Sequence, residues 1–384
     1  MRIKSILIAA NNYPTPTDPV HTFVEQLAIA ISKQGVKVTV IAPFRIVQHY
    51  LRHTELHPRY RELPVEGGES ITVMQPRCVT LGARFEKFNI WSAQKAISRA
   101  AKRLKVTPDV CYGHFWHWAY SVYPYARKNS IPLFVNTSET PIILHRICSE
   151  DMLKGFKNYI SGVVCGSTFC KEESIRAGLA TEELCMVRPN SIDSNLFYKK
   201  DKKKLRRQYG FDENAFIVAF TGWYTPMKGA GVLSKAIDIL ADRDIKSFFI
   251  GSTRSGAIDE TPSCDGVLHT GRLPHDKIPD YLNMADVFVL PTLAEGSSNA
   301  IIEAMACGLP IVSSNLPFNW DVLNENNSIM VNPKNVDEIA SAIALLKDNP
   351  KKREQMSKAA LETALGLTID KRAEKILSFI ESKY

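Results

Sequence analysis

Glu295 and Glu303 are separated by seven residues in the stretch PTLAEGSSNAIIEAMACGLP, which covers residues 291–310. A carboxylate near the start of a helix can accept hydrogen bonds from two vicinal hydroxyls, such as those of a ribose. The same carboxylate can instead complement the helix dipole, and for a single acid that is the simpler interpretation. A ligand-binding role for the two glutamates is therefore argued from the residues of the loop that joins them.

The residues between the two glutamates favour an anionic ligand. Gly296, Ser297 and Ser298 let the backbone pass close to a bound molecule, and Asn299 is expected to cap the following helix. The free amides of the first helical turn and the helix dipole would then suit a diphosphate. The loop follows the apolar run Asp286–Leu290, and open α/β sheets bind ligands at the carboxyl ends of such strands.

Short apolar runs alternate with amphipathic helical segments, which predicts α/β units with parallel sheets and helices on both faces. In the first half the expected strands are Lys4–Ala10, Lys37–Ala42, Ile71–Gln75, Asp109–Tyr112, Leu133–Thr137 and Gly162–Cys165, with helices at Phe23–Gln34 and Ile90–Lys105. In the second half the expected strands are Phe216–Phe220, Lys246–Ile250, Val267–His269, Asp286–Leu290 and Ile311–Ser313, with helices at Gly231–Ala241, Ile278–Met284, Asn299–Ala306, Val336–Leu346 and Lys352–Leu365.

A length of 384 residues exceeds one ordinary α/β core, so two domains are expected. We place the first domain at residues 1–195 and the second at residues 196–366, with a hinge between Pro189 and Lys204. In the last segment, residues 367–384, a helix is expected over about Ile369–Ser382, and it is expected to pack back on the first domain, because no strand follows it.

The net charge of +8 is unevenly distributed. Residues 1–200 hold 26 Lys and Arg against 16 Asp and Glu, and the remainder holds 22 against 24. The basic first half fits an anionic partner or an anionic membrane surface, although solvated helix faces also explain a modest excess. Aromatic residues do not alternate with basic ones along a stripe, so nucleic acid is not favoured. No apolar run approaches the roughly 20 residues that span a bilayer.

The eight cysteines form no CxxC pair, and the short apolar start of the chain is not expected to be a signal peptide. Reduced, packing thiols in the cytoplasm are the simplest interpretation. Asp242-Arg-Asp244 spells a metal-binding DxD, but it stands between a helix and a strand and is interpreted as a turn. His114 and His117 lack the further ligands of a zinc site. No metal and no cofactor is expected.

The spacing of the two glutamates, with Glu303 in EAMACGLP, resembles the signature of family 4 retaining glycosyltransferases, also called group 1. That family has two Rossmann-like domains that face each other across a cleft, the GT-B architecture. The resemblance extends along nearly the whole chain. It includes Tyr13-Pro14 with Glu25–Ala28, Arg188–Asp193, Thr221-Gly222 with Lys228-Gly229, and Ala285–Pro291.

This resemblance implies a nucleotide-sugar donor held mainly by the second domain. Glu303 would hold the ribose hydroxyls, and Glu295 would face hydroxyls of the donor sugar. Lys228, in the loop that follows Gly222, would neutralise negative charge on the leaving diphosphate, which is physically sound in a water-poor site. The resemblance also implies that the leaving phosphate takes the proton of the acceptor, so no side-chain general base is expected.

Two positions depart from the family pattern. The family usually has an arginine soon after the glycine of the phosphate loop, where this chain has Trp223-Tyr224, and Arg272 or backbone amides could replace it. The family often has a histidine after the strand that corresponds to Leu133–Thr137, where this chain has Ser138-Glu139. Reduced or absent activity therefore stays open.

Three residues of the first domain, Tyr13, His114 and Ser138, are candidates for contact with a sugar or an acceptor. His114 begins the segment HFWHW, in which Trp116 or Trp118 could stack on a sugar ring. A partly buried aromatic cluster with a hydrogen-bonded histidine explains the segment equally well.

The sequence therefore predicts a retaining glycosyltransferase that moves a sugar from a nucleotide-sugar donor, UDP-linked before GDP-linked, to a saccharide or lipid-linked acceptor in cell-surface polysaccharide or glycoconjugate synthesis. Such an enzyme would be cytoplasmic or peripheral at the inner membrane face. The main alternative is a non-catalytic relative that binds nucleotide or sugar as a partner subunit. A nicotinamide-dependent oxidoreductase is less favoured, because Asn11–Pro14 stands where GxGxxG would be required. A nucleotide-sugar epimerase of the same architecture is a lesser option.

Overall fold

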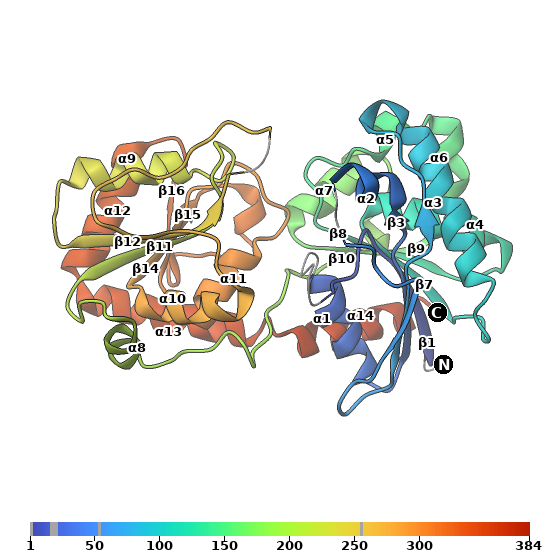
Figure 1. Cartoon of the computed structure of the whole chain (residues 1–384), viewed down its shortest axis with the longest axis horizontal. Helices are drawn as coiled ribbons and strands as arrows, with labels where there is room; N and C mark the ends of the chain where they lie inside the picture. The colour runs from blue at the N-terminus through green and yellow to red at the C-terminus, as the bar shows by residue number, and fades with distance from the viewer. Residues whose placement is uncertain (1–2, 16–21, 53–54, 254–255) are drawn as a thin grey trace. The chain divides into compact units, whose positions relative to one another are not determined.

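The computed structural model describes residues 3–15, 22–52, 55–253 and 256–384, and part of the first-loop resemblance, residues 16–21, lies outside them. The chain forms two compact units (Figure 1): Met1–Arg188 with Ile369–Tyr384, called the first unit, and Pro189–Thr368, called the second unit. The boundary falls at Arg188 rather than after residue 195, because the Ile192 N–H donates to the Leu367 carbonyl at 3.0 Å and so joins this segment to the second unit.

The described part of the first unit contains an eight-stranded sheet, parallel except for one edge strand, β4. Its strands are, in spatial order, β10 (Cys185–Val187), β9 (Ile160–Cys165), β8 (Leu133–Thr137), β7 (Val110–His114), β1 (Ser5–Ala9), β2 (Lys37–Ile41), β5 (Ile71–Met74) and β4 (Tyr60–Leu63). The central strands are buried on both faces, which explains their nearly continuous apolar sequences. The strand order reverses between β1 and β7, as in a doubly wound sheet.

Helices cover both faces of this sheet (Figure 1). They are α1 (Thr22–Ser32), α2 (Ile46–Arg52), α3 (Glu86–Ala101), α4 (Trp116–Lys128), α5 (Leu144–Ile147), α6 (Glu150–Lys157), α7 (Thr168–Arg176) and α14 (Ile369–Ser382), with 3-10 turns at Ala83–Phe85 and Glu182–Leu184. A separate pair of short parallel strands, β3 (Phe44–Arg45) and β6 (Arg77–Cys78), lies beside them.

The last helix, α14, belongs to the first unit. Its buried face shares a core cluster with α1, through Ala373, Ile376 and Ile380. The buried Arg372 guanidinium donates to the Arg188 carbonyl at 2.5 Å and to Asn136 Oδ1 at 2.8 Å. These contacts hold the end of the chain against the sheet of this unit.

The described part of the second unit contains a six-stranded, wholly parallel sheet. Its strands are, in spatial order, β13 (Val267–Gly271), β12 (Ile245–Ser252), β11 (Phe216–Trp223), β14 (Val287–Leu290), β15 (Ile311–Ser314) and β16 (Ser328–Val331). Its helices are α8 (Lys202–Tyr209), α9 (Ala230–Leu240), α10 (Ile278–Met284), α11 (Asn299–Ala306), α12 (Val336–Asp348) and α13 (Pro350–Leu365), with 3-10 turns at His275–Lys277 and Pro317–Asn319. The order reverses between β11 and β14, and α/β sheets bind ligands outside the carboxyl ends of their strands at such a point.

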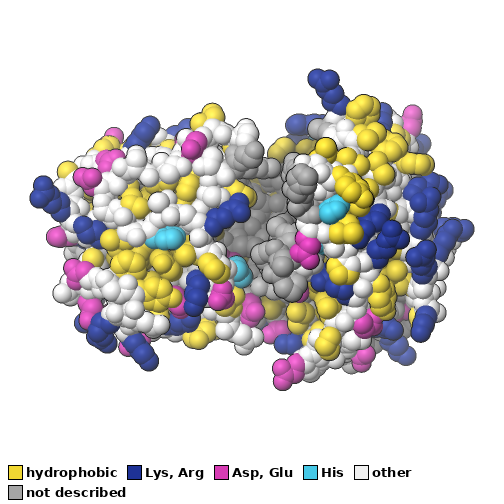
Figure 2. Space-filling model, viewed as in Figure 1, with side chains coloured by type: hydrophobic (Ala, Val, Ile, Leu, Met, Phe, Trp, Pro, Cys, Tyr) yellow, Lys and Arg dark blue, Asp and Glu magenta, His cyan; other side chains and the backbone are white. Residues whose placement is uncertain are grey.

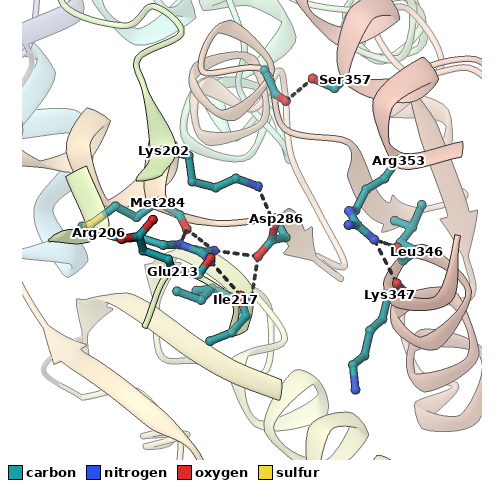
Figure 3. A network of polar contacts seen from close by, with 12 residues as sticks. Lys202, Arg206, Glu213, Ile217, Met284, Asp286, Leu346, Lys347, Arg353 and Ser357 are labelled. Carbon is teal, nitrogen blue, oxygen red and sulfur yellow. Dashed lines mark hydrogen bonds and ion pairs between the residues drawn. The ribbon is translucent and has the colours of Figure 1, made fainter. Parts of the chain in front are cut away.

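A buried polar network stabilises the second unit near the start of β14 (Figure 3). The Arg206 guanidinium, 1% exposed, donates to the carbonyls of Met284 and Ala215 and to Asp286 Oδ2 at 2.7 Å. The Lys202 ammonium contacts the other carboxylate oxygen of Asp286 at 2.5 Å. Burial would raise the pKa of Asp286, but Lys202 and Arg206 outweigh it and hold that pKa below its usual range. The hinge predicted between Pro189 and Lys204 therefore overlaps the start of a structural helix, α8, which begins at Lys202.

No helix among the described residues is both long and apolar enough to cross a lipid bilayer.

Candidate functional site

Two loops meet at the carboxyl edge of the second sheet, one after β11 and one after β14. The Met227 carbonyl accepts hydrogen bonds from Thr292 Oγ1 at 3.0 Å and from the Leu293 N–H at 2.8 Å. Gly229 has a φ of 76°, and a Cβ at this position would lie 2.5 Å from the Pro291 carbonyl oxygen. Only glycine fits this close crossing without strain, so the Lys-Gly pair of the sequence reflects a backbone requirement.

The crossing brings Lys228 and Glu295 together. The Lys228 ammonium forms an ion pair with Glu295 Oε1, and the two side chains are 23% and 12% exposed. A partly buried pair of this kind is screened less than one on the open surface, and it fixes the position of the ammonium group. Two of the residues selected from the sequence for the donor site are therefore in direct contact.

Glu303 lies on α11, the helix that begins immediately after the second loop. Its side chain is 16% exposed, and Glu303 Oε1 lies 4.0 Å from His275 Nε2. The contact with Glu303 raises the pKa of His275 above its ordinary value, against the opposing effect of burial. The ring of Phe197 packs edge-on against His275 at a centroid distance of 5.4 Å.

His275 was not among the residues selected from the sequence. The residue precedes α10, on an element of its own, and no local motif connects it with Glu303. Only the packing of α10 beside α11 brings the two side chains together.

Asn190 holds the glycine-serine loop in place within the second unit. Its backbone N–H donates to Ser297 Oγ at 2.9 Å, and its side-chain amide donates to the Ser297 carbonyl at 3.0 Å and to Asn299 Oδ1 at 2.8 Å. The expectation that Asn299 caps α11 is therefore wrong. Ser298 occupies the cap position without a side-chain cap bond, and Asn299 is the first helical residue, turned toward Asn190.

Gly296 is buried in the same loop, while Ser297 and Ser298 are half-buried. The loop therefore presents its serines next to the start of α11, where the helix dipole and the first amide groups favour negative charge.

Trp223 ends β11 and Arg272 follows β13, and the two side chains lie together although β12 separates these strands in the sheet. The Arg272 guanidinium carbon lies 5.1 Å from the centroid of the Trp223 ring, and its Nε donates to Ser252 Oγ at 2.8 Å. Gly222 is the residue before Trp223, and its carbonyl oxygen would lie 1.8 Å from a Cβ on Gly251. From the sequence we proposed Arg272 as a replacement for the arginine that the family usually has where this chain has Trp223-Tyr224. In the structure the Arg272 guanidinium lies beside Trp223.

The three residues selected in the first unit differ in their surroundings. Tyr13 is 0% exposed and lies in the core, so the structure places it behind the surface rather than at it. His114 ends β7, is 6% exposed, and packs against the rings of Phe23 and Phe115 at 5.0 Å and 4.8 Å. Ser138 follows β8 and is half-buried.

Trp116 and Trp118, which we considered as stacking faces for a sugar, are 0% and 4% exposed. The Trp116 ring instead packs edge-on against Phe156 at 6.2 Å. Of the two interpretations of the HFWHW segment, the structure supports the buried aromatic cluster.

Glu139 was named in the sequence only as part of a departure from the family pattern. Its carboxylate accepts the Trp116 N–H at 2.8 Å at the start of α4. Burial raises the pKa of Glu139 to about 7, and this hydrogen bond opposes the rise only partly.

The DxD segment is a turn between α9 and β12. Asp242 Oδ1 accepts the Asp244 N–H at 2.9 Å, and the Lys347 ammonium pairs with Asp242. Within the described ranges, no cluster of three His, Cys, Asp or Glu side chains is arranged to hold a metal ion.

Residues 201–363 match the family model described as "Glycosyl transferases group 1". The putative teichuronic acid biosynthesis glycosyltransferase TuaC of Bacillus subtilis is 25% identical over 355 residues, with 88% of each chain covered. The protein is a glycosyltransferase. Lys228, Glu295 and Glu303 all lie inside the matched group 1 segment.

Two solved structures show the fold. A sucrose-phosphate synthase of Thermosynechococcus elongatus superposes with a TM-score of 0.78 at 16% identity, covering 100% of both chains. Anabaena Alr3699/HepE, solved in complex with UDP and glucose, superposes with a TM-score of 0.70 at 17% identity, also over 100% of both chains. The fold of this glycosyltransferase is GT-B, with two Rossmann-like units. The match of residues 201–363 to a glycosyltransferase family favours a transferase over the oxidoreductase alternative.

Proposed function

We propose that this enzyme transfers a sugar from a nucleotide-sugar donor, with retention of anomeric configuration as in family 4, to a saccharide or lipid-linked acceptor. The second unit binds the donor, and the first unit binds the acceptor. The observation that carries the proposal is the contact of Lys228 with Glu295 at the point where the strand order reverses, next to the helix that holds Glu303.

The proposed chemistry follows from the charges at this edge of the sheet. Departure of a nucleoside diphosphate builds negative charge on the leaving oxygens, and a positioned cation that meets this charge lowers the barrier. Lys228 supplies that cation, and the Arg272 guanidinium beside Trp223 supplies a second one near the diphosphate. The leaving phosphate itself takes the acceptor proton, so the enzyme needs no side-chain base, metal or cofactor.

Glu303 accepts hydrogen bonds from the ribose hydroxyls, and Glu295 serves both as the partner of Lys228 and as a contact for hydroxyls of the donor sugar. His275 helps to hold the Glu303 carboxylate in position. Ser297, Ser298 and the first amides of α11 meet the phosphates.

A UDP-sugar is the donor we propose first. Supporting this choice, HepE, which shares the fold, was solved with UDP and glucose. The printed name of TuaC refers to teichuronic acid biosynthesis, which supports an acceptor in cell-surface polysaccharide or glycoconjugate synthesis.

The donor site is tested by thermal unfolding in the presence of UDP, GDP, ADP or NAD. A ligand at about 100 times its Kd stabilises the folded protein by about 2.7 kcal/mol. We expect one nucleoside diphosphate to raise the Tm of the native enzyme and to have no effect on Glu303→Ala. The matched control is Glu362→Ala, which removes an exposed glutamate of α13 and should keep the response. No response to any nucleoside diphosphate would reject the donor site.

Catalysis is tested separately by following the donor that binds. A transferase releases the nucleoside diphosphate with acceptor present and hydrolyses the donor slowly without it, and the anomeric configuration of the product reports retention. A protein that binds the donor but neither transfers nor hydrolyses it would instead match the non-catalytic partner subunit.

A further inference from the structure

The first unit exposes a group of large apolar side chains on one part of its surface. We call Tyr50, Leu51, Leu81, Phe85, Phe88 and Trp91 the apolar rim; their exposures run from 36% for Phe88 to 75% for Leu51. Figure 2 shows hydrophobic side chains gathered on the upper part of this unit, with Lys and Arg side chains beside them. Contiguous exposed apolar surface on a soluble protein marks an interaction site.

The amphipathic pattern of α3 creates most of the rim. Ile90, Ala93 and Ile97 are buried in the core, so the opposite side of the helix faces solvent. Phe88 and Trp91 stand on that outer side, with ring centroids 5.7 Å apart. A core-facing helix normally carries polar residues on its outer side, and here two aromatic rings replace them.

Hydrogen bonds fix the segment before α3 against the same outer side. The Leu81 N–H donates to Asn89 Oδ1 at 2.9 Å, and the Asn89 amide donates to the Gly82 carbonyl at 2.9 Å. The Val79 N–H donates to Ser92 Oγ at 3.0 Å. Leu81 and Phe85 are therefore held beside Phe88 and Trp91 rather than on a loose loop. β3 and β6 run parallel, so the segments that follow them start at the same edge of this strand pair. One of these segments is α2, which carries Tyr50 and Leu51, and the other leads to α3.

Positive charge accompanies the rim. Residues 79–105 contain seven Lys and Arg and one acid, Glu86. The Lys95 ammonium lies 6.0 Å from the centroid of the Trp91 ring, so charge and aromatic surface occupy one face of α3. Exposed aromatic and aliphatic side chains together with Lys and Arg are the composition that binds the interface of an anionic bilayer.

A pocket of about 320 Å³ opens among the same elements. Its polar lining consists of Arg45, Gln48, Thr80, Glu86, Asn89 and His117. Burial and the nearby Arg45 lower the pKa of His117 to about 4, so this imidazole is neutral at physiological pH and Arg45 is the cation of the pocket. A polar pocket within an apolar and basic surface fits the head group of an amphiphile whose chains remain in a membrane.

We propose that the apolar rim docks onto an anionic lipid bilayer and that the pocket beside it receives the polar head group of a membrane-embedded acceptor. This inference rests on the proposed function for its acceptor, while the docking itself requires no donor. The exposed rings of Phe85, Phe88 and Trp91 enter the interface, and the basic residues of 79–105 meet the anionic head groups.

The test is sedimentation of the full chain with vesicles of phosphatidylcholine alone, or of equal parts of phosphatidylcholine and phosphatidylglycerol. We expect binding to the anionic vesicles, weak binding to the neutral ones, and loss of binding as salt rises from about 0.05 M to about 0.5 M. The double variant Phe85→Ser, Trp91→Ser should bind at least about tenfold more weakly. The control Ile239→Ser, Ile258→Ser removes two side chains of at least equal exposure, 56% and 72%, from the second unit and should bind as the native chain does.

A second measurement tests whether the apolar rim enters the bilayer. Quenchers attached to lipid chains should reduce the tryptophan fluorescence of the native chain, and Trp91→Tyr should lose most of that quenching. Failure to bind anionic vesicles, or equal loss in both double variants, would overturn the docking proposal even if UDP still raises the Tm. A dimer in solution that Phe85→Ser, Trp91→Ser converts to a monomer would show that the rim binds a second copy instead. Vesicle binding without any response to nucleotides would reject the proposed function and leave the docking intact.

Discussion

Lys228 and Glu295, 67 positions apart in the chain, form an ion pair at the point where the strand order of the second sheet reverses. Each residue belongs to a loop that follows a different central strand, β11 or β14. Parallel strands that lie side by side end at the same edge, so their loops meet there although their sequences are distant. The pair therefore lies at the proposed donor site and holds the ammonium group at a defined position.

Replacing Lys228 by Met removes the cation and keeps most of the aliphatic side chain. We expect kcat for sugar transfer to fall by about 10²–10³, the usual effect of removing one positioned group that stabilises transition-state charge. Steady-state kinetics with the donor found by thermal unfolding would measure this. Lys235→Met, on the exposed face of α9, is the control and should leave kcat unchanged. An equal loss of kcat in both variants would contradict a specific role for Lys228.

Gly229 and Gly210 offer a matched comparison, because both have a φ near 75° but different surroundings. Ala at Gly210 meets open space and should cost about 1 kcal/mol through the left-handed backbone alone. Ala at Gly229 adds the clash with the Pro291 carbonyl, which should cost roughly 1–3 kcal/mol more and displace the adjacent Lys228. Urea unfolding and transfer rates would measure both effects. Equal destabilisation by the two variants would mean that the loop crossing is not tightly packed.

Arg206 and Arg207 are neighbours on α8 with opposite environments. Arg206→Ala leaves Asp286 and several carbonyls buried without their main donor, and we expect the free energy of unfolding to fall by about 3–5 kcal/mol. Arg207 pairs with Glu213 with 60% of its side chain exposed, so Arg207→Ala should cost no more than about 1 kcal/mol. Denaturant unfolding would measure the free energy of unfolding of both variants. Similar losses of this free energy would reject a special role for the buried network.

Glu139 predicts a pH dependence of stability. Its pKa is raised to about 7 from 4.5, so between these values the folded protein retains a proton that the unfolded chain has released. The free energy of unfolding therefore falls as pH rises through this window. Glu139→Gln keeps an acceptor for the Trp116 N–H without the charge, and it should be more stable than the native protein at pH 8, by about 1–3 kcal/mol, but not at pH 4.

The measurement is thermal unfolding as a function of pH, with Glu172→Gln on the exposed face of α7 as the control. A pH profile that Glu139→Gln leaves unchanged would show that this carboxyl group titrates normally.

Local sequence patterns predicted the helices and strands whose formation depends on the properties of consecutive residues. β8, α10, α11 and α14 have the bounds that the sequence predicted, because alternation and helical periodicity are properties of consecutive residues. The two glutamates, the lysine of the phosphate loop and the small residues between the glutamates were likewise identifiable from type and spacing. The sequence patterns did not predict α8, whose charged residues hide the buried positions Leu205 and Arg206, or β16, which is only four residues long.

Tertiary structure decided which of these residues touch one another. It placed His275 against Glu303, turned Asn299 from a cap into a partner of Asn190, and buried Tyr13 in the core. It also turned Arg206, one cation among several in a basic segment, into the centre of a buried network. Residue type and spacing define what a side chain can do, whereas burial and partners come from segments far away in the chain. The residue types of the proposed donor site could therefore be selected from the sequence, but their geometry exists only in the folded sheet.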